Sequence, residues 1–358
     1  MGGGTPSGDP ARTLPTGILA VMLDAGVRVL DDPDPLFAEL IAAVKASLLD
    51  LGHEASGSDA ALTLAIGRPG RYRLAEARRD GPVVVWTGEP LPSRAARSHG
   101  GGAPGASARA LRRVRRSLGP LIRGVPLPAA LEDRRVAMTT ARLVAANLDE
   151  LRVADRVRAR IVVTSRDRAA RLADAGIASI AVPFGYHPLH AGPLATGGTR
   201  DHPLVMLGSP ARHTRRARLA ARMVESAGPD LLVCHAIWGD ERAALLRRTA
   251  VVVDVHRVPG NFVGLRLLLG IAAGAVVVTE PMTDPYPFAP GVHYVEAVES
   301  DLLRVARSLV GDDARRLAIV EAGQRLLATE LTMERSVARV IGSTGDLDEM
   351  GGVGEPSG

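Results

Sequence analysis

Short apolar runs alternate with amphipathic stretches along most of this chain. The clearest unit spans residues 249–281, where two β-branched runs, Ala250 to Val255 and Ala275 to Thr279, flank a Pro/Gly/Asn loop and a helical segment from about Val263 to Ala273. Runs that are apolar at every position are typical of strands covered on both faces, as in parallel sheets. The unit is therefore predicted to fold as a strand, a helix and a second, parallel strand.

The same periodicity predicts the remaining elements. Strands are expected at residues 17–23, 61–66, 82–87, 161–164, 180–183, 203–208 and 231–236, and helices at residues 35–51, 111–118, 129–154, 165–175, 240–248, 301–309, 314–329 and 333–341. Strands that alternate with helices favour parallel sheets and the α/β class. With 358 residues, the chain is long enough for two domains with separate cores.

Polar residues follow the first strand of the 249–281 unit. His256, Arg257 and Asn261 fall at its carboxyl end, which is where open α/β sheets bind ligands. The next helix carries Gly264 and Arg266 in its first turn, beside backbone N–H groups that have no partner within the helix. A positive side chain there is unfavourable to the helix dipole unless an anion is bound, so the pattern predicts a phosphate site.

A second element of the same kind opens the other half of the chain. An apolar strand ends in Gly208 and Ser209, and the predicted helix that follows carries Arg212, Arg215 and Arg216. A glycine lets the backbone approach a ligand closely, and arginines bind phosphate oxygens. The two elements together predict a cradle for a diphosphate.

Several motifs resemble a known family. They are the 249–281 unit, the Glu-Pro at residues 280–281, the Phe-Ala-Pro-Gly at 288–291, the Val-Pro-Phe-Gly-Tyr-His-Pro at 182–188, the Leu-Gly-Ser at 207–209 with its later arginines, and the Thr-Met-Glu-Arg at 332–335. Over roughly residues 160–343 the chain resembles the C-terminal domain of group 1 glycosyltransferases of the GT-B fold, closest to the spore-maturation-type branch. One departure is that Leu269 stands where the family usually has a glutamate.

The resemblance implies an α/β protein with two Rossmann-like domains facing a cleft. The expected division is a disordered N-terminus (1–13), an N-terminal acceptor-side domain (14–186), a linker (187–202), a C-terminal nucleotide-sugar-binding domain (203–330), a helix that crosses back (331–342) and a disordered tail (343–358). It also implies sugar transfer from a nucleoside-diphosphate sugar without a metal, with retention at the anomeric carbon.

Further donor contacts are expected at strand ends. Trp238 could stack on a nucleobase, with packing as an equal alternative, and Thr279 and Glu280 end the second strand of the 249–281 unit, where a carboxylate can bind sugar hydroxyls. Because Leu269 stands where the family usually has an acid, Glu280 is the nearest acidic residue that could take over the role of that acid. The predicted donor-binding residues are Gly208, Ser209, Arg215, Trp238, Asn261, Gly264, Arg266, Thr279 and Glu280, and the predicted catalytic residues are Glu89 and Glu280.

The acceptor side is predicted from the segment Trp-Thr-Gly-Glu-Pro-Leu-Pro at residues 86–92, which follows an apolar strand. Trp86 could line an acceptor pocket and Glu89 could accept a hydroxyl proton. A buried tryptophan followed by a turn is the open alternative. The acceptor itself is not indicated and could be a small molecule, a lipid or a polysaccharide.

The charge of the chain changes this picture little. The formal net charge is +5, but Lys45 is the single lysine, and aromatic residues make up 3% of the chain. So few aromatic side chains leave few stacking platforms for bases, so nucleic acid is not an expected partner. The arginines of the 111–118 helix are expected to form a solvated face, with peripheral membrane contact at most. Any phosphate clamp must therefore be built from arginine and backbone N–H groups.

No metal or cofactor is expected. The histidines and the single cysteine, Cys234, have no zinc-site spacing, and the Asp-Asp-Pro-Asp at residues 31–34 fits helix capping better than a metal-binding Asp-x-Asp. No apolar run approaches a membrane span, and the start lacks a signal peptide's apolar core, so a cytoplasmic location is expected. Two alternatives stay open: a glycosyltransferase-like protein without transfer activity that binds a nucleotide or a partner, and an epimerase or phosphorylase on the same fold.

Overall fold

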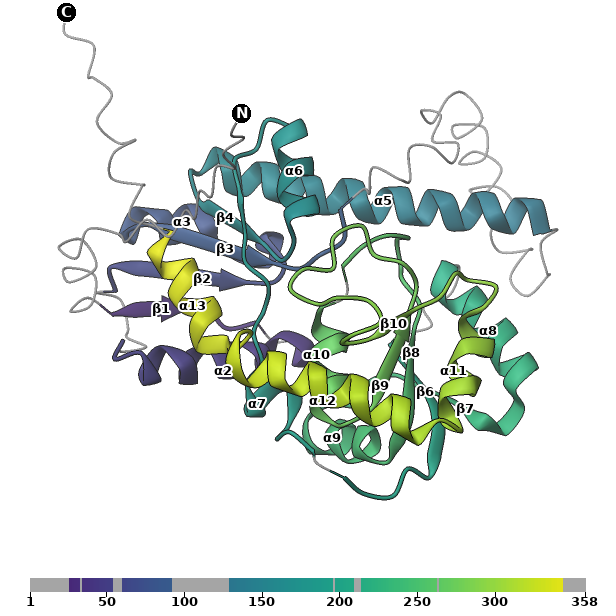
Figure 1. The fold of residues 1–358 in the computed structure, drawn as a ribbon. Coiled ribbons are helices and arrows are strands. Elements are labelled where there is room, and N and C mark those ends of the chain that lie inside the picture. Colours follow the sequence, from purple (N-terminus) through teal and green to yellow (C-terminus); the bar gives the residue numbers. More distant parts are fainter. Residues whose placement is uncertain are drawn as a thin grey trace, which may run out of the picture.

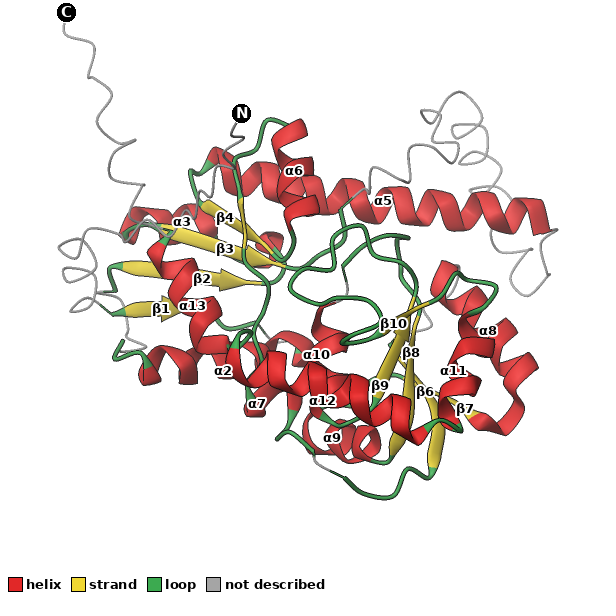
Figure 2. Cartoon of the chain, in the orientation of Figure 1, coloured by secondary structure: helices red, strands yellow, loops and turns green. Residues whose placement is uncertain are grey.

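Two five-stranded parallel sheets, each flanked by helices, form the described part of the chain (Figures 1 and 2). The computed structural model describes residues 26–32, 34–53, 60–91, 129–195, 197–208, 214–262 and 264–343. The expected disordered N-terminus, the strand expected at 17–23, the helix expected at 111–118 and the tail after residue 343 lie outside these residues.

The first sheet has the order β1-β2-β3-β4-β5. Its strands are β1 (Val27–Val29), β2 (Leu62–Ile66), β3 (Val83–Thr87), β4 (Arg160–Val163) and β5 (Ile180–Ala181), and its helices are α2 (Pro35–Asp50), α3 (Leu74–Asp80), α5 (Ala129–Arg156) and α6 (Arg166–Asp174). Every residue of β2 and β3 is buried, as continuous apolar runs require in a sheet covered on both faces. Neither β1 nor α3 was predicted from the sequence.

The second sheet has the order β10-β9-β8-β6-β7. Its strands are β6 (His202–Leu207), β7 (Leu231–Cys234), β8 (Thr249–Asp254), β9 (Val276–Thr279) and β10 (Val295–Glu296), and its helices are α8 (Arg215–Ala227), α9 (Gly239–Arg247), α10 (Gly264–Ala272), α11 (Leu302–Val310) and α12 (Asp313–Thr329). The predicted strand, helix and parallel strand of the 249–281 unit are β8, α10 and β9, paired in parallel register. The α/β class is confirmed.

The chain passes between the two sheets where Tyr186 meets the segment before α13 (Met333–Gly342). Tyr186 donates its N–H to the carbonyl of Leu331 (2.7 Å) and accepts from the N–H of Met333 (2.8 Å). A Cβ at Gly185 would lie 2.2 Å from the carbonyl oxygen of Thr332, so this close crossing requires a glycine. Helix α7 (Pro188–Ala191) follows within the predicted linker, and α13 packs against α2.

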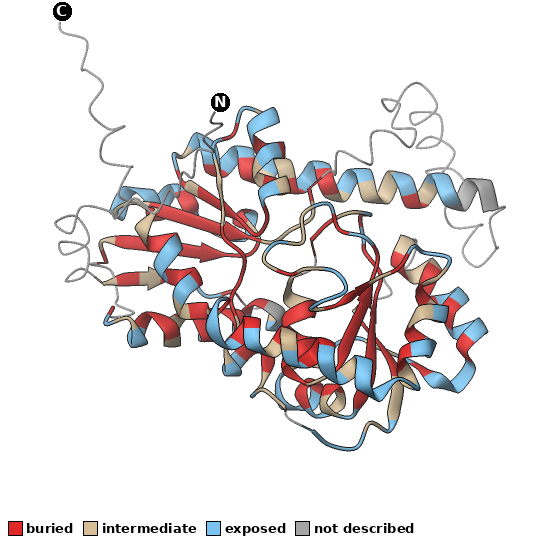
Figure 3. Ribbon diagram, viewed as in Figure 1, coloured by how far each residue is buried: buried red, intermediate tan, exposed pale blue. Residues whose placement is uncertain are grey.

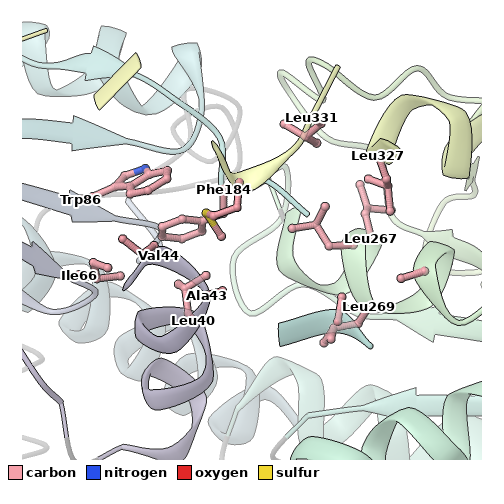
Figure 4. Packing of buried hydrophobic residues seen from close by; sticks show 14 of the residues in the cluster. Leu40, Ala43, Val44, Ile66, Trp86, Phe184, Leu267, Leu269, Leu327 and Leu331 are labelled. Atoms are coloured by element: carbon pink, nitrogen blue, oxygen red, sulfur yellow. The ribbon is translucent and has the colours of Figure 1, made fainter. Parts of the chain in front are cut away.

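Buried apolar side chains continue from one sheet to the other. One cluster contains Trp86 and Phe184 of the first half together with Leu267, Leu327 and Leu331 of the second (Figure 4). The strands β2, β3, β8 and β9 are buried along their whole length, whereas the outward faces of the helices are exposed (Figure 3). Among the helices that the structure describes, none has the length and apolar character needed to cross a membrane.

Candidate active site

The carboxyl ends of the two sheets face each other through direct contacts. In α6, which follows β4, Arg168 donates from Nη2 to the carbonyl of Phe262 in the loop after β8 (3.0 Å). Arg166 of the same helix forms an ion pair with Asp284 in the loop after β9 (2.9 Å). Parallel α/β sheets bind ligands at this edge, so residues of both halves can reach one ligand.

Asp254, the last residue of β8, is the buried acid at the centre of the second sheet's edge. Its side chain has no exposed surface and accepts a hydrogen bond from Nη1 of Arg266 (2.7 Å), which lies in the first turn of α10. From the sequence alone, a positive side chain at this helix N-terminus predicts a bound anion. That inference needs correction because Asp254 supplies a negative charge from within the protein. The other N–H groups of Arg266 make no hydrogen bond to any described residue, and its side chain is 22% exposed.

His256 and Thr279 continue this buried network. Nε2 of His256 lies 2.8 Å from the hydroxyl of Thr279, which also lies 3.5 Å from Asp254. Burial lowers the pKa of His256 and outweighs the nearby carboxylates, so the ring is neutral at physiological pH. Thr279, predicted as a donor contact, has no exposed surface and uses its hydroxyl inside the protein.

Glu280 and Arg215 are tied to each other. The carboxylate of Glu280 accepts from both terminal nitrogens of Arg215, at 2.7 Å from Nη1 and with a shorter contact from Nη2, and from the backbone N–H of His256 (2.8 Å). Arg215 also donates to Glu299 (2.6 Å) and to the carbonyl of His256 (3.2 Å). Both predicted residues therefore brace the ends of β8 and β9 against the start of α8, and their predicted ligand contacts stay predictions.

Arg216, the neighbour of Arg215, has terminal N–H groups that no described residue accepts. It is 2% exposed, and its Nε donates to the carbonyl of Val255 (2.8 Å), while its terminal nitrogens make no hydrogen bond to any described residue. Burial lowers the pKa of Arg216, the charges of Arg266 and Arg257 lower it as well, and Asp254 and Glu280 raise it, with a net pKa of about 8. A buried cation without a bonded acid is costly, and a bound anion would offset that cost.

Gly208 lies directly beside this guanidinium. A Cβ at Gly208 would lie 2.9 Å from Nη1 of Arg216, and the backbone there has a φ of +124°. The backbone conformation at the end of β6 therefore favours a glycine, and a Cβ there would displace the Arg216 guanidinium. Ser209, the next predicted donor contact, and Arg212 lie outside the described residues.

Glu89, predicted to act on the acceptor, follows β3 on the opposing sheet. Its carboxylate is partly buried and makes no hydrogen bond or ion pair within the described parts of the chain. Burial raises the pKa of Glu89, the charges of Arg68, Arg257 and Arg168 lower it, and Glu150 raises it again. A raised carboxyl pKa favours proton acceptance, which is the task predicted for this residue.

The predicted role of Trp86 in an acceptor pocket needs a correction. Its side chain has no exposed surface, its ring lies 4.7 Å from that of Phe184, and its indole N–H donates to the carbonyl of Val182 (2.9 Å). Figure 4 shows it among the buried apolar residues of the shared cluster. The structure thus matches the alternative of a buried tryptophan followed by a turn, and Trp86 offers no surface to an acceptor.

The remaining predicted donor contacts lie around the second sheet's edge. Trp238 is the partly buried N-cap residue of α9, just past the end of β7. Asn261 is buried and donates from Nδ2 to the carbonyl of Val258 (3.2 Å). Gly264 begins α10 under the ring of Phe262, which a Cβ would meet at 2.5 Å. Their contacts with a donor stay predictions.

Leu269 fills the place of the family's usual acid with apolar packing. It is 5% exposed and lies with Leu267, Leu327 and Leu331 in the cluster shared by both halves (Figure 4). A carboxylate at this position would be buried among apolar groups unless a ligand reached it.

One group of side chains that sequence spacing did not indicate could hold a cation. Asp50, His187 and Glu334, from the end of α2, the N-cap of α7 and the first turn of α13, have ligand atoms within 4.8 Å of one another. Nδ1 of His187 accepts the backbone N–H of Leu189 (3.1 Å). Because a neutral imidazole has one lone-pair nitrogen, His187 could ligate a metal only by giving up this bond. The group lies on elements other than those that carry Arg216, Arg266 and Glu89.

Two site residues were missed by the sequence argument. Asp254 ends a run of buried valines, and an acid at the end of such a strand was an available signal. Arg168, which joins the two halves through Thr164 and Phe262, had no such signal, because α6 carries several arginines and its sequence does not say which one faces inward.

Comparisons with known proteins support the fold. Residues 211–342 match a family model described as Glycosyl transferase-like, whereas no curated protein matches the chain. HepE of Anabaena, solved in complex with UDP and glucose, is similar over 90% of this chain and 100% of its own, with 13% identity and a TM-score of 0.52. Sucrose-phosphate synthase from Thermosynechococcus elongatus is similar over 90% of this chain and 81% of its own, with 12% identity and a TM-score of 0.50.

At such identities the similarity establishes a shared fold, and it confirms the GT-B architecture predicted from the sequence. The spore-maturation-type branch is not distinguished by these matches and stays a prediction.

Proposed function

We propose that this protein is a glycosyltransferase that moves a sugar from a nucleoside-diphosphate sugar to an acceptor hydroxyl. The observation that carries the proposal is Arg216 at the carboxyl end of a parallel sheet, beside Gly208 and near Arg266. Its guanidinium is buried, and its terminal N–H groups have no acceptor among the described residues. Such an arrangement suits a diphosphate, because arginine N–H groups and a helix N-terminus bind phosphate oxygens.

The donor half of the reaction follows from these groups. As the bond between the anomeric carbon and the phosphate oxygen breaks, negative charge develops on the leaving nucleoside diphosphate. Arg216, Arg266 and the N-terminus of α10 would stabilise this charge, and Asp254 would hold Arg266 in place. Because these cationic groups supply the needed charge, we propose that transfer does not depend on a metal ion.

The acceptor half is assigned to Glu89. The acceptor oxygen forms the new bond to the anomeric carbon, and its proton passes to the carboxylate of Glu89, which lies across from the donor site on the other sheet. The family model over residues 211–342 and the fold shared with HepE, a protein solved with UDP, support the donor class and make UDP the first nucleotide to test. Retention at the anomeric carbon rests on the sequence resemblance.

The alternative is a protein that binds the nucleotide without transfer. Leu269 favours it, because a buried leucine replaces the acid that the family usually carries. The two functions agree on donor binding and differ on turnover.

A binding screen followed by a turnover assay tests the proposal. UDP-, GDP-, dTDP- and ADP-sugars are compared by thermal shift in EDTA, because a ligand of the native state raises the melting temperature. The sugar that binds is then assayed for transfer and for slow hydrolysis, with product configuration read by NMR.

Glu89→Gln should lower turnover by about 100-fold or more, as expected for loss of a general base, and should still bind the donor. Glu76→Gln, on the exposed face of α3, is the matched control. Binding without turnover in the wild type would favour the non-catalytic alternative, and absence of binding to all four sugars would reject the donor class.

A further inference from the structure

Arg257 is a charged residue of the facing edges that neither the donor nor the acceptor assignment has used. It follows His256 in the loop after β8 and is exposed. Its guanidinium makes no hydrogen bond or ion pair with any residue that the structure describes. By contrast, Arg266 in the same region is bound to Asp254 (2.7 Å), and Arg68 across the interface is bound to Glu150 (2.6 Å).

The loop of Arg257 and the loop of Glu89 are linked through Thr164 and Arg168 at the start of α6. A Cβ at Gly88, the neighbour of Glu89, would lie 3.5 Å from the side chain of Thr164. Thr164 in turn accepts a hydrogen bond from Arg168, and Arg168 donates to the carbonyl of Phe262, in the loop that contains Arg257. These contacts bring the loop that contains Glu89 and the loop that contains Arg257 to the same side of α6, from opposite halves of the protein.

The charged side chains around Glu89 differ in whether they already have a bonded partner. Arg68, Arg257 and Arg168 attract its carboxylate and Glu150 repels it, from four different elements or loops. The charge of Arg68 is neutralised by its ion pair with Glu150. Arg168 is buried, and its terminal nitrogens donate hydrogen bonds to the neutral oxygens of Thr164 and Phe262. No N–H group of the Arg257 guanidinium donates a hydrogen bond to a described residue. The charged groups that act on it electrostatically are the cations Arg266 and Arg68 and the carboxylate of Glu89.

We propose that Arg257 is shared by the two substrate sites: it attracts Glu89 while the donor site is empty and turns to the diphosphate of the donor when that site is filled. This inference rests on the proposed function. In the empty protein Arg257 favours the ionised form of Glu89, and a bound diphosphate withdraws that attraction by neutralising the guanidinium. Glu89 then becomes a stronger proton acceptor when the donor is in place, which favours an order of donor first and proton transfer second.

The sharing predicts that Glu89 and Arg257 are coupled in nucleotide binding. UDP affinity is measured by calorimetry for the wild type, Glu89→Gln, Arg257→Ala and the double variant. Arg257→Ala should weaken UDP binding by about ten- to a hundredfold, through loss of a charge-assisted hydrogen bond. Glu89→Gln should strengthen it by about three- to tenfold, because the competing carboxylate is removed. In the Arg257→Ala background the same change should have an effect of less than about twofold, because there is no longer a shared group.

Two further variants test whether the effect depends on the charge at position 257 and on its location. Arg257→Lys keeps the charge and should keep most of the Glu89→Gln effect, whereas Arg79→Ala, on the exposed surface of α3, should leave UDP affinity unchanged. Urea unfolding of each variant checks that the fold is intact.

Three results would overturn the sharing. Full UDP affinity in Arg257→Ala would mean that the guanidinium does not contact the diphosphate. An equal gain from Glu89→Gln in both backgrounds would mean that the carboxylate only repels the nucleotide. Failure of the wild type to bind either UDP or inorganic pyrophosphate would reject both this inference and the proposed donor site. Coupled UDP binding without any sugar transfer would support the sharing and reject only the enzymatic function.

Discussion

At the scale of single residues, three arginines near one sheet edge differ in how many hydrogen-bond partners their guanidinium groups have. Both terminal nitrogens of Arg215 are held by Glu280 and other acceptors, and one terminal nitrogen of Arg266 is held by Asp254. Arg216 has the least exposure and no bonded acid among the described residues. The cost of a buried charge is relieved only by a counter-charge, so the least satisfied guanidinium is the one most suited to an anionic ligand.

Arg216 gives the first prediction. Arg216→Met keeps an apolar stem of similar length and removes the charge, so it should weaken UDP binding by about ten- to a hundredfold. The empty protein should lose little stability or gain some, because burial lowers the pKa of Arg216 and so disfavours its charged form. Calorimetry and urea unfolding measure the two effects. A variant with unchanged UDP affinity would contradict the assignment of Arg216 to the diphosphate.

The pair of Arg266 and Asp254 gives the second prediction. Arg266→Ala leaves a fully buried carboxylate without its partner, and because the arginine is partly exposed we expect a loss of about 2–3 kcal/mol in the free energy of unfolding. Adding Asp254→Asn should restore part of this stability, because the uncompensated charge is removed. Urea unfolding of both variants is the measurement. If the double variant were less stable than Arg266→Ala by the full cost of Asp254→Asn alone, the two side chains would be energetically independent.

At the scale of elements, α2 of the first sheet completes the N-terminus of α9 in the second. Glu39 of α2 accepts the backbone N–H of Gly239 (2.6 Å) and a hydrogen bond from the buried Arg242 (2.5 Å). Arg242 also donates to the carbonyl of His190 in α7 (2.6 Å). A carboxylate at a helix N-terminus satisfies both a free N–H and the helix dipole, so these helices are joined by more than apolar contact.

The third prediction concerns His190, which is 2% exposed at this junction. Burial lowers the pKa of His190 to about 3, assisted by the charges of Arg242 and His187. The unfolded chain then binds a proton below pH of about 6.5 that the folded chain does not, so stability is complete above that pH and falls as the pH drops toward 3. The loss can reach about 1.4 kcal/mol per pH unit for one proton.

Denaturant unfolding between pH 7 and 4 checks this slope. His190→Gln should show a shallower fall in unfolding free energy than the wild type, whatever its stability at pH 7. His202→Gln, at the partly exposed start of β6, is the control. Parallel curves for the wild type and His190→Gln would show that His190 does not account for the acid sensitivity.

At the scale of the whole molecule, the two halves are joined in two places. One is the crossing at Tyr186 and the start of α13, and the other is the contact of α6 with the loops after β8 and β9. Asp284 accepts the backbone N–H groups of Arg166 (2.8 Å) and Asp167 (3.3 Å) and so completes the N-terminus of α6 from the opposite half. The guanidinium of Arg166 lies over the ring of Tyr286, 4.5 Å from its centre.

The fourth prediction tests this contact. Asp284→Ala should expose the amides of Arg166 and Asp167 to faster hydrogen exchange, because it removes their acceptor. The cost in global stability should be about 1 kcal/mol, as for loss of a helix cap. Asp149→Ala, whose partner Arg152 lies on the same exposed helix surface, should leave exchange at α6 unchanged. Unaltered protection at Arg166 and Asp167 would show that the two halves do not meet there in solution.

The sequence by itself determined the local structure of the site. The apolar run before Asp254, the Pro/Gly/Asn loop and the helix with Arg266 in its first turn were predicted as strand, loop and helix, and β8, α10 and β9 have nearly those bounds. Periodicity and turn residues act within a few positions along the chain, so they can be read from the chain alone. The α/β class followed from the same pattern, and the GT-B architecture followed from the motifs that resemble group 1 glycosyltransferases.

Only the tertiary structure decided what each side chain of the site contacts. Trp86 is buried, Arg215 is bound by acids, and Arg216 has terminal N–H groups without an acceptor among the residues that the structure describes, although the two arginines are adjacent in sequence. The tertiary structure also paired Arg266 with Asp254, an acid on another element. The physical reason is that the cost of a charge depends on its distance from water and from opposite charges, and these distances are set by elements that meet from far along the chain.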